Sequence, residues 1–230
     1  MTDTVTASPS STTGSSTTRP STALTLAELT RAIRDAIVGG EFAPNQRLIE
    51  ADLSAAFGAS RASVRTALFE LANDGLIDRL PNRGSRVRAI SLDEAVEILE
   101  VRIGIEGLCA EKAAERITDD EIAELGRLRA GILASVESGD LLEYSRLNQL
   151  LDRRIREISG HTAAVEILER LRAQSVRHQF RLSFQAGRAS VSGPEHVAII
   201  DAVTRRDPAA AAAATRAHLL SVIDALRALD

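Results

Sequence analysis

The segment from Leu48 to Gly84 constrains the fold of this chain more than any other segment. It contains two short runs with apolar residues at helical spacing, separated by a turn at Gly58. Two alternating segments follow, joined by the turn Pro-Asn-Arg-Gly at 81–84. Two helices joined by a tight turn and followed by a β-hairpin predict a winged helix-turn-helix.

Caps and spacing set the bounds of the expected elements in this half of the chain. Gly39 and Gly40 end the first helix, Ser60 is a good N-cap for the third, and Gly75 stops it. Pro44 favours a short extended connector before the second helix. We expect helices over 24–37, 50–57 and 61–74, and strands over 76–80 and 85–89.

The start of the third expected helix is the candidate DNA-reading surface, because this part of a helix-turn-helix enters the major groove. An arginine such as Arg61 or Arg65 can hold guanine O6 and N7 through two bonds, and free helix N–H groups suit a phosphate. Outside this frame, two exposed arginines would indicate only a solvated face. Arg83 at the wing tip could reach the minor groove or a phosphate. The candidate DNA-binding residues are Ser60, Arg61, Ala62, Arg65, Arg83 and Gly84.

The charge distribution agrees with a DNA partner although the net charge of the chain is −4. Between residues 60 and 90, six arginines face three acidic residues, a local charge of +3. A basic face on an acidic body can orient a protein on a phosphate surface. No apolar run approaches the roughly 18 to 20 residues of a membrane span. The single cysteine, Cys109, indicates a reducing compartment, so we expect a cytoplasmic protein with no membrane partner.

The rest of the chain is expected to be wholly helical. Residues 1–23 are nearly all Ser, Thr, Ala and Pro and predict a disordered tail, followed by a winged helix over 24–90. Residues 91–230 predict an antiparallel helical bundle, so the fold class is mainly α. Within the bundle we expect helices over 92–117, 120–137, 140–158, 162–185, 194–204 and 208–229.

Polar residues of the expected bundle form a candidate metal-ligand set. Asn148 and Asp152 lie four residues apart on one helix face, and the four histidines all follow them: His161, His178, His196 and His218. One carboxylate with two imidazoles is a common ligand set for zinc, iron, manganese or nickel. A single helical histidine is more often a surface or core residue, so spacing alone leaves both interpretations open.

Residues 24–90 resemble the DNA-binding domain of the GntR family of bacterial transcription regulators. The resemblance rests on the segments IVGGEFAPNQRLIEADLSAAFGASRASVRTALFELANDGLI and PNRGSRV. Asn45 stands where the family has glycine, and Ala62 stands where it has a hydroxyl-bearing residue. The second departure affects which operator sequence is read rather than DNA binding itself.

Residues 91–230 resemble the all-helical effector-binding FCD domain of the FadR-type branch of the same family. The matching segments are EVRIGIEGLCAEKAAER, NQLLDRRIREISGH and GPEHVAIIDAVTRRDPAAAAAATRAHL. The resemblance implies that Arg102 contacts a small carboxylate effector. It also implies one divalent metal (Zn, Ni, Mn or Fe) held by Asn148, Asp152, His196 and His218. Asp152 replaces a histidine of the family, which leaves either an altered metal site or a lost one.

The resulting hypothesis is a homodimeric regulator, by default a repressor, that releases double-stranded operator DNA when a carboxylate effector binds the bundle. A metal-responsive or effector-independent DNA-binding regulator is the alternative. A metal-dependent enzyme using Asp152, His196 and His218 is a remote alternative, because no nucleophile or general base accompanies the set.

Overall fold

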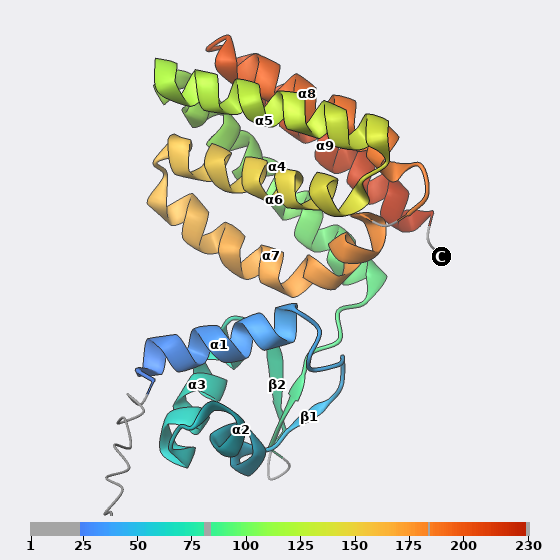
Figure 1. Cartoon of the computed structure of the whole chain (residues 1–230). Helices are drawn as coiled ribbons and strands as arrows, with labels where there is room; N and C mark the ends of the chain where they lie inside the picture. The colour runs from blue at the N-terminus through green and yellow to red at the C-terminus, as the bar shows by residue number, and fades with distance from the viewer. Residues whose placement is uncertain (1–23, 81–83, 184, 229–230) are drawn as a thin grey trace, which may run out of the picture.

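The computed structural model describes residues 24–80, 84–183 and 185–228, which form two packed regions (Figure 1). The first region contains α1 (Leu26–Val38), β1 (Arg47–Leu48), α2 (Glu50–Phe57), α3 (Arg61–Asn73), β2 (Ile77–Leu80) and β3 (Gly84–Val87). The second contains α4 (Leu92–Arg116), α5 (Asp119–Ser138), α6 (Leu141–Ser159), α7 (Thr162–Ser183), α8 (Arg188–Thr204) and α9 (Pro208–Arg227). The mainly α class, with a winged helix and a helical bundle, is confirmed. The expected tail at 1–23 and the wing-tip residue Arg83 lie outside the described residues.

The small sheet of the winged helix has the order β1-β3-β2, and both pairings are antiparallel. Strand β1, where Arg47 pairs with Arg86, was expected only as an extended connector. A strand of two residues has no alternation from which to predict it. Asn45 positions it, with a left-handed φ of 64° and an N–H that donates to the Val87 oxygen at 2.9 Å. Asparagine adopts this conformation more easily than most residues, which explains its place in a glycine position.

The winged helix has its own hydrophobic core, built from α1, α2, α3 and the sheet. Helix α3 begins where the sequence predicts, because the Ser60 hydroxyl accepts a bond from the Ser63 N–H at 3.0 Å. Its core residues are Leu29, Ile33, Ile37, Leu48, Leu53, Val64, Ala67, Leu68, Leu71, Leu76, Ile77 and Val87. One residue from the second region, Ala173 of α7, also packs against this core.

Helix α4 is the centre of the bundle and contacts α6, α7, α8 and α9. Ser91 caps it by accepting the Glu94 N–H at 3.1 Å. Alanines on one side of α4, together with Leu125 and Ile132 of α5, form a core beneath α5, α6 and α8. Leu99 on α4 and Leu219 on α9 belong to a second core nearer the C-terminus. Helix α7 is the bundle helix that borders the winged helix, and it lies between α6 and α1 (Figure 1).

Helix α8 differs from the sequence expectation. A start at Pro194 is wrong: the helix begins at Arg188, after Gly187 with a φ of +79°. Pro194 fits best in a first turn, which suggested a boundary, but here it lies inside the helix. A Cβ on Gly193 would lie 2.8 Å from the Val136 side chain of α5, so the two helices approach closely. The longer helix places His196 in its interior rather than at its start.

Helix α9 is long and apolar enough to cross a membrane by length and composition, with a mean hydropathy of 1.2 over its best window. This finding departs from the expectation that no apolar run approaches the length of a membrane span. In the fold, α9 packs against α4 and α8 and buries a stripe of side chains: Ala211, Thr215, Leu219, Ile223 and Leu226. A core helix of a folded domain meets the same length and composition test.

Candidate DNA interface and ligand cavity

The N-terminal turn of α3 presents two exposed arginines, Arg61 and Arg65. Arg65 donates from Nε and Nη2 to the two carboxylate oxygens of Glu50 on α2, at 3.0 and 2.8 Å. Hydrogen bonding by Arg65 lowers the pKa of Glu50. The Arg65 side chain is 67% exposed, and ion pairs this exposed contribute little stability, so the guanidinium can exchange Glu50 for another acceptor.

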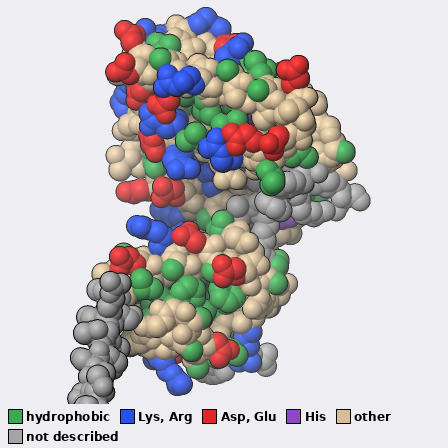
Figure 2. Space-filling model, viewed as in Figure 1, with side chains coloured by type: hydrophobic (Ala, Val, Ile, Leu, Met, Phe, Trp, Pro, Cys, Tyr) green, Lys and Arg blue, Asp and Glu red, His purple; other side chains and the backbone are tan. Residues whose placement is uncertain are grey.

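The wing turns at Gly84, whose φ of +82° favours glycine. Beside the wing, the Arg79 guanidinium lies 5.4 Å from the centre of the Phe69 ring, and Arg86 pairs with Asp78 at 3.0 Å. Figure 2 shows basic side chains at the lower end of this region, with an acidic one among them, and both charge signs over the bundle.

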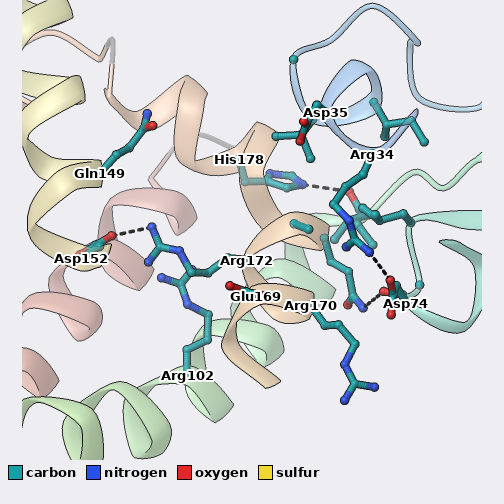
Figure 3. A pocket seen from close by; sticks show the side chains of 18 of the residues that line it. Arg34, Asp35, Asp74, Arg102, Gln149, Asp152, Glu169, Arg170, Arg172 and His178 are labelled. Carbon is teal, nitrogen blue, oxygen red and sulfur yellow. Dashed lines mark hydrogen bonds and ion pairs between the residues drawn. The ribbon is translucent and has the colours of Figure 1, made fainter. Parts of the chain in front are cut away.

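A cavity of about 1550 Å³ extends from the boundary between the two regions into the bundle (Figure 3). Its outer part is lined by Arg34 and Asp74, which pair with each other, and by His178. Its inner part is lined by residues of α4, α6, α7, α8 and α9. All of the sequence-predicted effector and metal residues are among them: Arg102, Asn148, Asp152, His196 and His218.

Five charged side chains form what we call the central charge cluster: Arg102, Glu106, Asp152, Arg156 and Arg172. Arg102 on α4 contacts the Glu106 carboxylate at 2.7 Å, and Arg172 on α7 contacts Asp152 on α6 at 2.6 Å. Arg172 also lies 3.5 Å from Glu106, so its guanidinium joins α4, α6 and α7. No sequence pattern identified Arg172, because its partners come from two other helices.

Burial and the neighbouring charges shift the pKa values of this cluster in opposite directions. Only 2% of Arg102 is exposed; burial lowers the pKa of its guanidinium, and the Glu106 carboxylate opposes this shift. Burial acts to raise the pKa of Asp152, but Arg172 and the other nearby arginines outweigh it and hold that pKa well below its usual range. Asp152 is therefore an anion whose charge is already engaged by Arg172.

His196 is buried, with one ring nitrogen bonded and the other without a partner. Its Nδ1 lies 3.1 Å from the Tyr144 hydroxyl, which also bonds Ser192, and Ser192 donates its one hydroxyl proton to the Arg188 carbonyl at 3.0 Å. Tyr144 must then donate to Ser192, so His196 donates from Nδ1. Burial raises the pKa of Tyr144 to about 12, which keeps its hydroxyl proton in place. The buried Nε2 is left as an unpartnered acceptor.

His218 is oriented in a comparable way. Its Nδ1 lies 2.8 Å from the Glu195 carboxylate, and the centres of the His196 and His218 rings are 4.4 Å apart. The buried Oδ1 of Asn148 also has no partner. Even so, the described residues contain no group of three or more His, Cys, Asp or Glu side chains arranged to hold a metal. Asp152, the expected carboxylate ligand, faces Arg172 instead.

Helix α7 contacts both the cavity and the winged helix. Arg172 faces the central charge cluster, and the Ser175 hydroxyl lies 3.5 Å from Arg102 (Figure 3). The Gln174 amide donates to the Asp74 carbonyl, at the end of α3, at 2.7 Å, and His178 Nε2 lies 2.9 Å from the Ile90 carbonyl. The other remaining histidine, His161, accepts the Ala164 N–H at 3.3 Å near the start of α7.

The hydrogen-bond chain through Tyr144 makes a specific prediction for His196. Burial is the largest cause that lowers its pKa, to about 3 from an ordinary value of 6.5. Nitrogen-15 NMR should show a neutral Nδ1–H tautomer with no titration between pH 5 and 8. Because the unfolded histidine takes up a proton below pH 6.5 and the folded one does not, this group should reduce stability as pH falls from 6.5 toward 3. An Nε2–H tautomer would contradict the assigned chain of donors.

Comparisons with known proteins agree with this architecture. Residues 25–87 match the family model "Bacterial regulatory proteins, gntR family", and residues 97–221 match the FCD domain. The HTH-type transcriptional repressor RspR of Escherichia coli K12 is 30% identical over 205 residues, covering 87% of this chain and 88% of that protein. The repressor GlaR of the same strain is 26% identical over 207 residues, 84% of this chain and 91% of its own.

Solved structures show the same fold. E. coli McbR/YncC has a TM-score of 0.74 at 20% identity, covering 90% of this chain and 99% of its own. A GntR regulator from Rhodococcus sp. RHA1 has a TM-score of 0.68 at 19% identity, covering 89% and 98%. The chain belongs to the GntR family of bacterial transcription regulators: it is a DNA-binding regulator with an FCD domain, and not an enzyme.

Proposed function

We propose that α3 is the recognition helix and that Arg61 and Arg65 contact base edges of the operator. The observation that carries this proposal is that both guanidinium groups are exposed at the N-terminal turn of α3. Ser60 and Ala62 lie in the same turn, where backbone N–H groups suit a phosphate. At the wing, Gly84 provides the turn; Arg83, outside the described residues, is proposed as a DNA contact from the sequence alone.

Glu50 has a defined part in this proposal. It holds the Arg65 guanidinium through two hydrogen bonds. Guanine offers two acceptors with a similar spacing, so the base can replace the carboxylate at little cost. The free protein therefore keeps Arg65 oriented before it meets DNA.

Arg65→Ala should weaken binding to an operator selected from random duplexes by roughly 10- to 100-fold, the loss expected for one two-bond base contact. Fluorescence anisotropy at moderate salt measures it. Arg146→Ala is the matched control, because Arg146 is also exposed and forms a two-bond pair with Glu143, but on the bundle. Equal affinity of both variants would refute the assignment of Arg65.

We propose that the inner cavity binds a small carboxylate effector and that this binding controls the DNA affinity of a cytoplasmic homodimer. The excess of arginine at its inner end favours an anion, and Arg102 contributes charge from the floor of the site. Two relatives are named repressors, so repression with release on effector binding is the proposed sign. A dimer is needed for two recognition helices to reach adjacent half-sites.

Helix α7 is the proposed route from effector to DNA. An anion at the central charge cluster competes with Asp152 and Glu106 for Arg172, and so acts on α7 directly. Two residues further along, Gln174 bonds the end of the recognition helix. An effector that favours a second position of α7 would therefore also favour a second orientation of the winged helix.

Gln174→Ala should reduce the effect of effector on DNA binding while leaving effector binding intact. The probe is any carboxylate that raises the Tm of the unmodified protein, and operator affinity is measured with and without it. Gln149→Ala is the control, because Gln149 lines the same cavity from α6 and forms no hydrogen bond with the described part of the winged helix. If both variants respond to the carboxylate as the unmodified protein does, the route through α7 is wrong.

A metal-responsive regulator is the second candidate, favoured by the unpartnered Nε2 of His196. The donor chemistry fits a divalent metal: His196 and His218 each donate from Nδ1, which leaves Nε2 of the neutral ring as a possible ligand, and Asn148 Oδ1 is free. Asp152 would complete the set after exchanging Arg172 for the metal. A bound metal would supply a positive charge to a carboxylate oxygen of the effector.

His218→Ala tests the metal proposal. The unmodified protein, incubated with Zn²⁺ and desalted, should retain about one equivalent by elemental analysis, since one shared site is proposed. His218→Ala should lose it, because one of two imidazole ligands is removed. His178→Ala should retain it, since His178 lines the outer cavity and bonds Ile90. The same metal content in all three proteins would exclude this site.

A further inference from the structure

Arg156 differs from the other buried or half-buried arginines that line the cavity. Arg102 pairs with Glu106, Arg172 pairs with Asp152, and Arg188 lies 3.2 Å from Glu195. Arg156, on α6 one turn beyond Asp152, is half-buried and lines the cavity. Its guanidinium has no hydrogen bond or ion pair with any residue that the structure describes.

The surroundings of Arg156 compensate only in part for its burial. A small recess next to the cavity is also lined by Arg156, between apolar side chains that include Leu151, Ile155 and Ile199. Burial is the largest cause that lowers the pKa of this guanidinium, and the neighbouring charge of Arg172 lowers it further; the carboxylates of Asp152 and Glu106 oppose this shift without outweighing it. A partly buried charge without a hydrogen-bond partner is costly, so a protein that retains one usually has a use for it.

The net charge of the central charge cluster also points to Arg156. The central charge cluster contains three guanidinium groups, Arg102, Arg156 and Arg172, and two carboxylates, Glu106 and Asp152. Both carboxylates already pair with Arg102 and Arg172. The remaining charge of +1 lies on Arg156. One singly charged anion would balance the cluster, whereas a doubly charged anion would leave a buried negative charge.

We propose that Arg156 is the anchor for the effector and that it selects a monocarboxylate through a two-bond contact. This inference rests on the proposed binding of a carboxylate in the cavity, and it assigns the contact to a residue that neither motif nor spacing had indicated. Arg102, which is held by Glu106 and Ser175, then acts as a positioning residue beneath the ligand.

The test is calorimetric titration of the full chain with acetate, propionate, benzoate, succinate and inorganic phosphate. The unmodified protein should bind at least one of the monocarboxylates more tightly than succinate or phosphate. Arg156→Gln should weaken that binding roughly 10- to 100-fold, the loss expected for charge-assisted bonds. Arg153→Gln is the control on the same helix, since Arg153 is exposed and lines the same cavity. Arg156→Lys should recover part of the affinity, because it restores the charge but not the planar fork.

The outcomes separate this inference from the proposal on which it rests. Equal monocarboxylate affinity in Arg156→Gln and the unmodified protein would overturn the role of Arg156 and leave a carboxylate effector standing. Preference for succinate or phosphate would overturn the assignment of a singly charged ligand. Failure of the unmodified protein to bind any carboxylate would overturn both. The ligand-free Tm of Arg156→Gln should equal or exceed that of the unmodified protein, which shows that the variant folds and that the charge was only partly compensated.

Discussion

The packing of α4, α6 and α7 depends on two carboxylates that are shared between two arginines, Arg102 and Arg172. Glu106 and Asp152 are fixed on α4 and α6, and Arg172 reaches both from α7. Breaking a buried ion pair by removing one partner typically costs about 3 to 5 kcal/mol, because the other charge is left unpaired. The relative positions of the three helices are therefore set by charge as much as by apolar packing. An unbalanced cluster is also sensitive to any anion that enters it.

The same cluster bears on the proposed metal site, because Arg172 pairs with its carboxylate, Asp152. A neutral imidazole at position 152 would not attract Arg172 as a carboxylate does. The fixed cation of Arg172 thus occupies one side of the proposed metal site and neutralises its only carboxylate. His196 and His218 keep donor patterns suited to a metal, since neither imidazole depends on Asp152 for its orientation.

The winged helix could be predicted from sequence because its signals are local. Helical spacing, the Ser60 cap and the glycine turns specify α2, α3 and the hairpin within about forty residues. Strand β1 was not predicted, because it forms only through pairing with β3. The start of α8 was predicted wrongly, because Pro194 is a residue typical of the first turn of a helix. Within the cavity, the histidines followed from family resemblance. Arg156 and Arg172 could not be predicted, because whether each guanidinium has a carboxylate partner depends on how α4, α6 and α7 pack together.

The position of Ala173 limits which DNA-binding domains and sensor domains can be combined in one regulator. The Ala173 methyl group packs against the hydrophobic core of the winged helix although it comes from α7 of the bundle. A DNA-binding domain transplanted onto another sensor domain would meet a different residue at this position and would have to pack against it. The contact between α7 and the winged helix therefore restricts which DNA-binding and sensor domains are compatible. Recombination between relatives should preserve a small side chain here even where effector and operator both change.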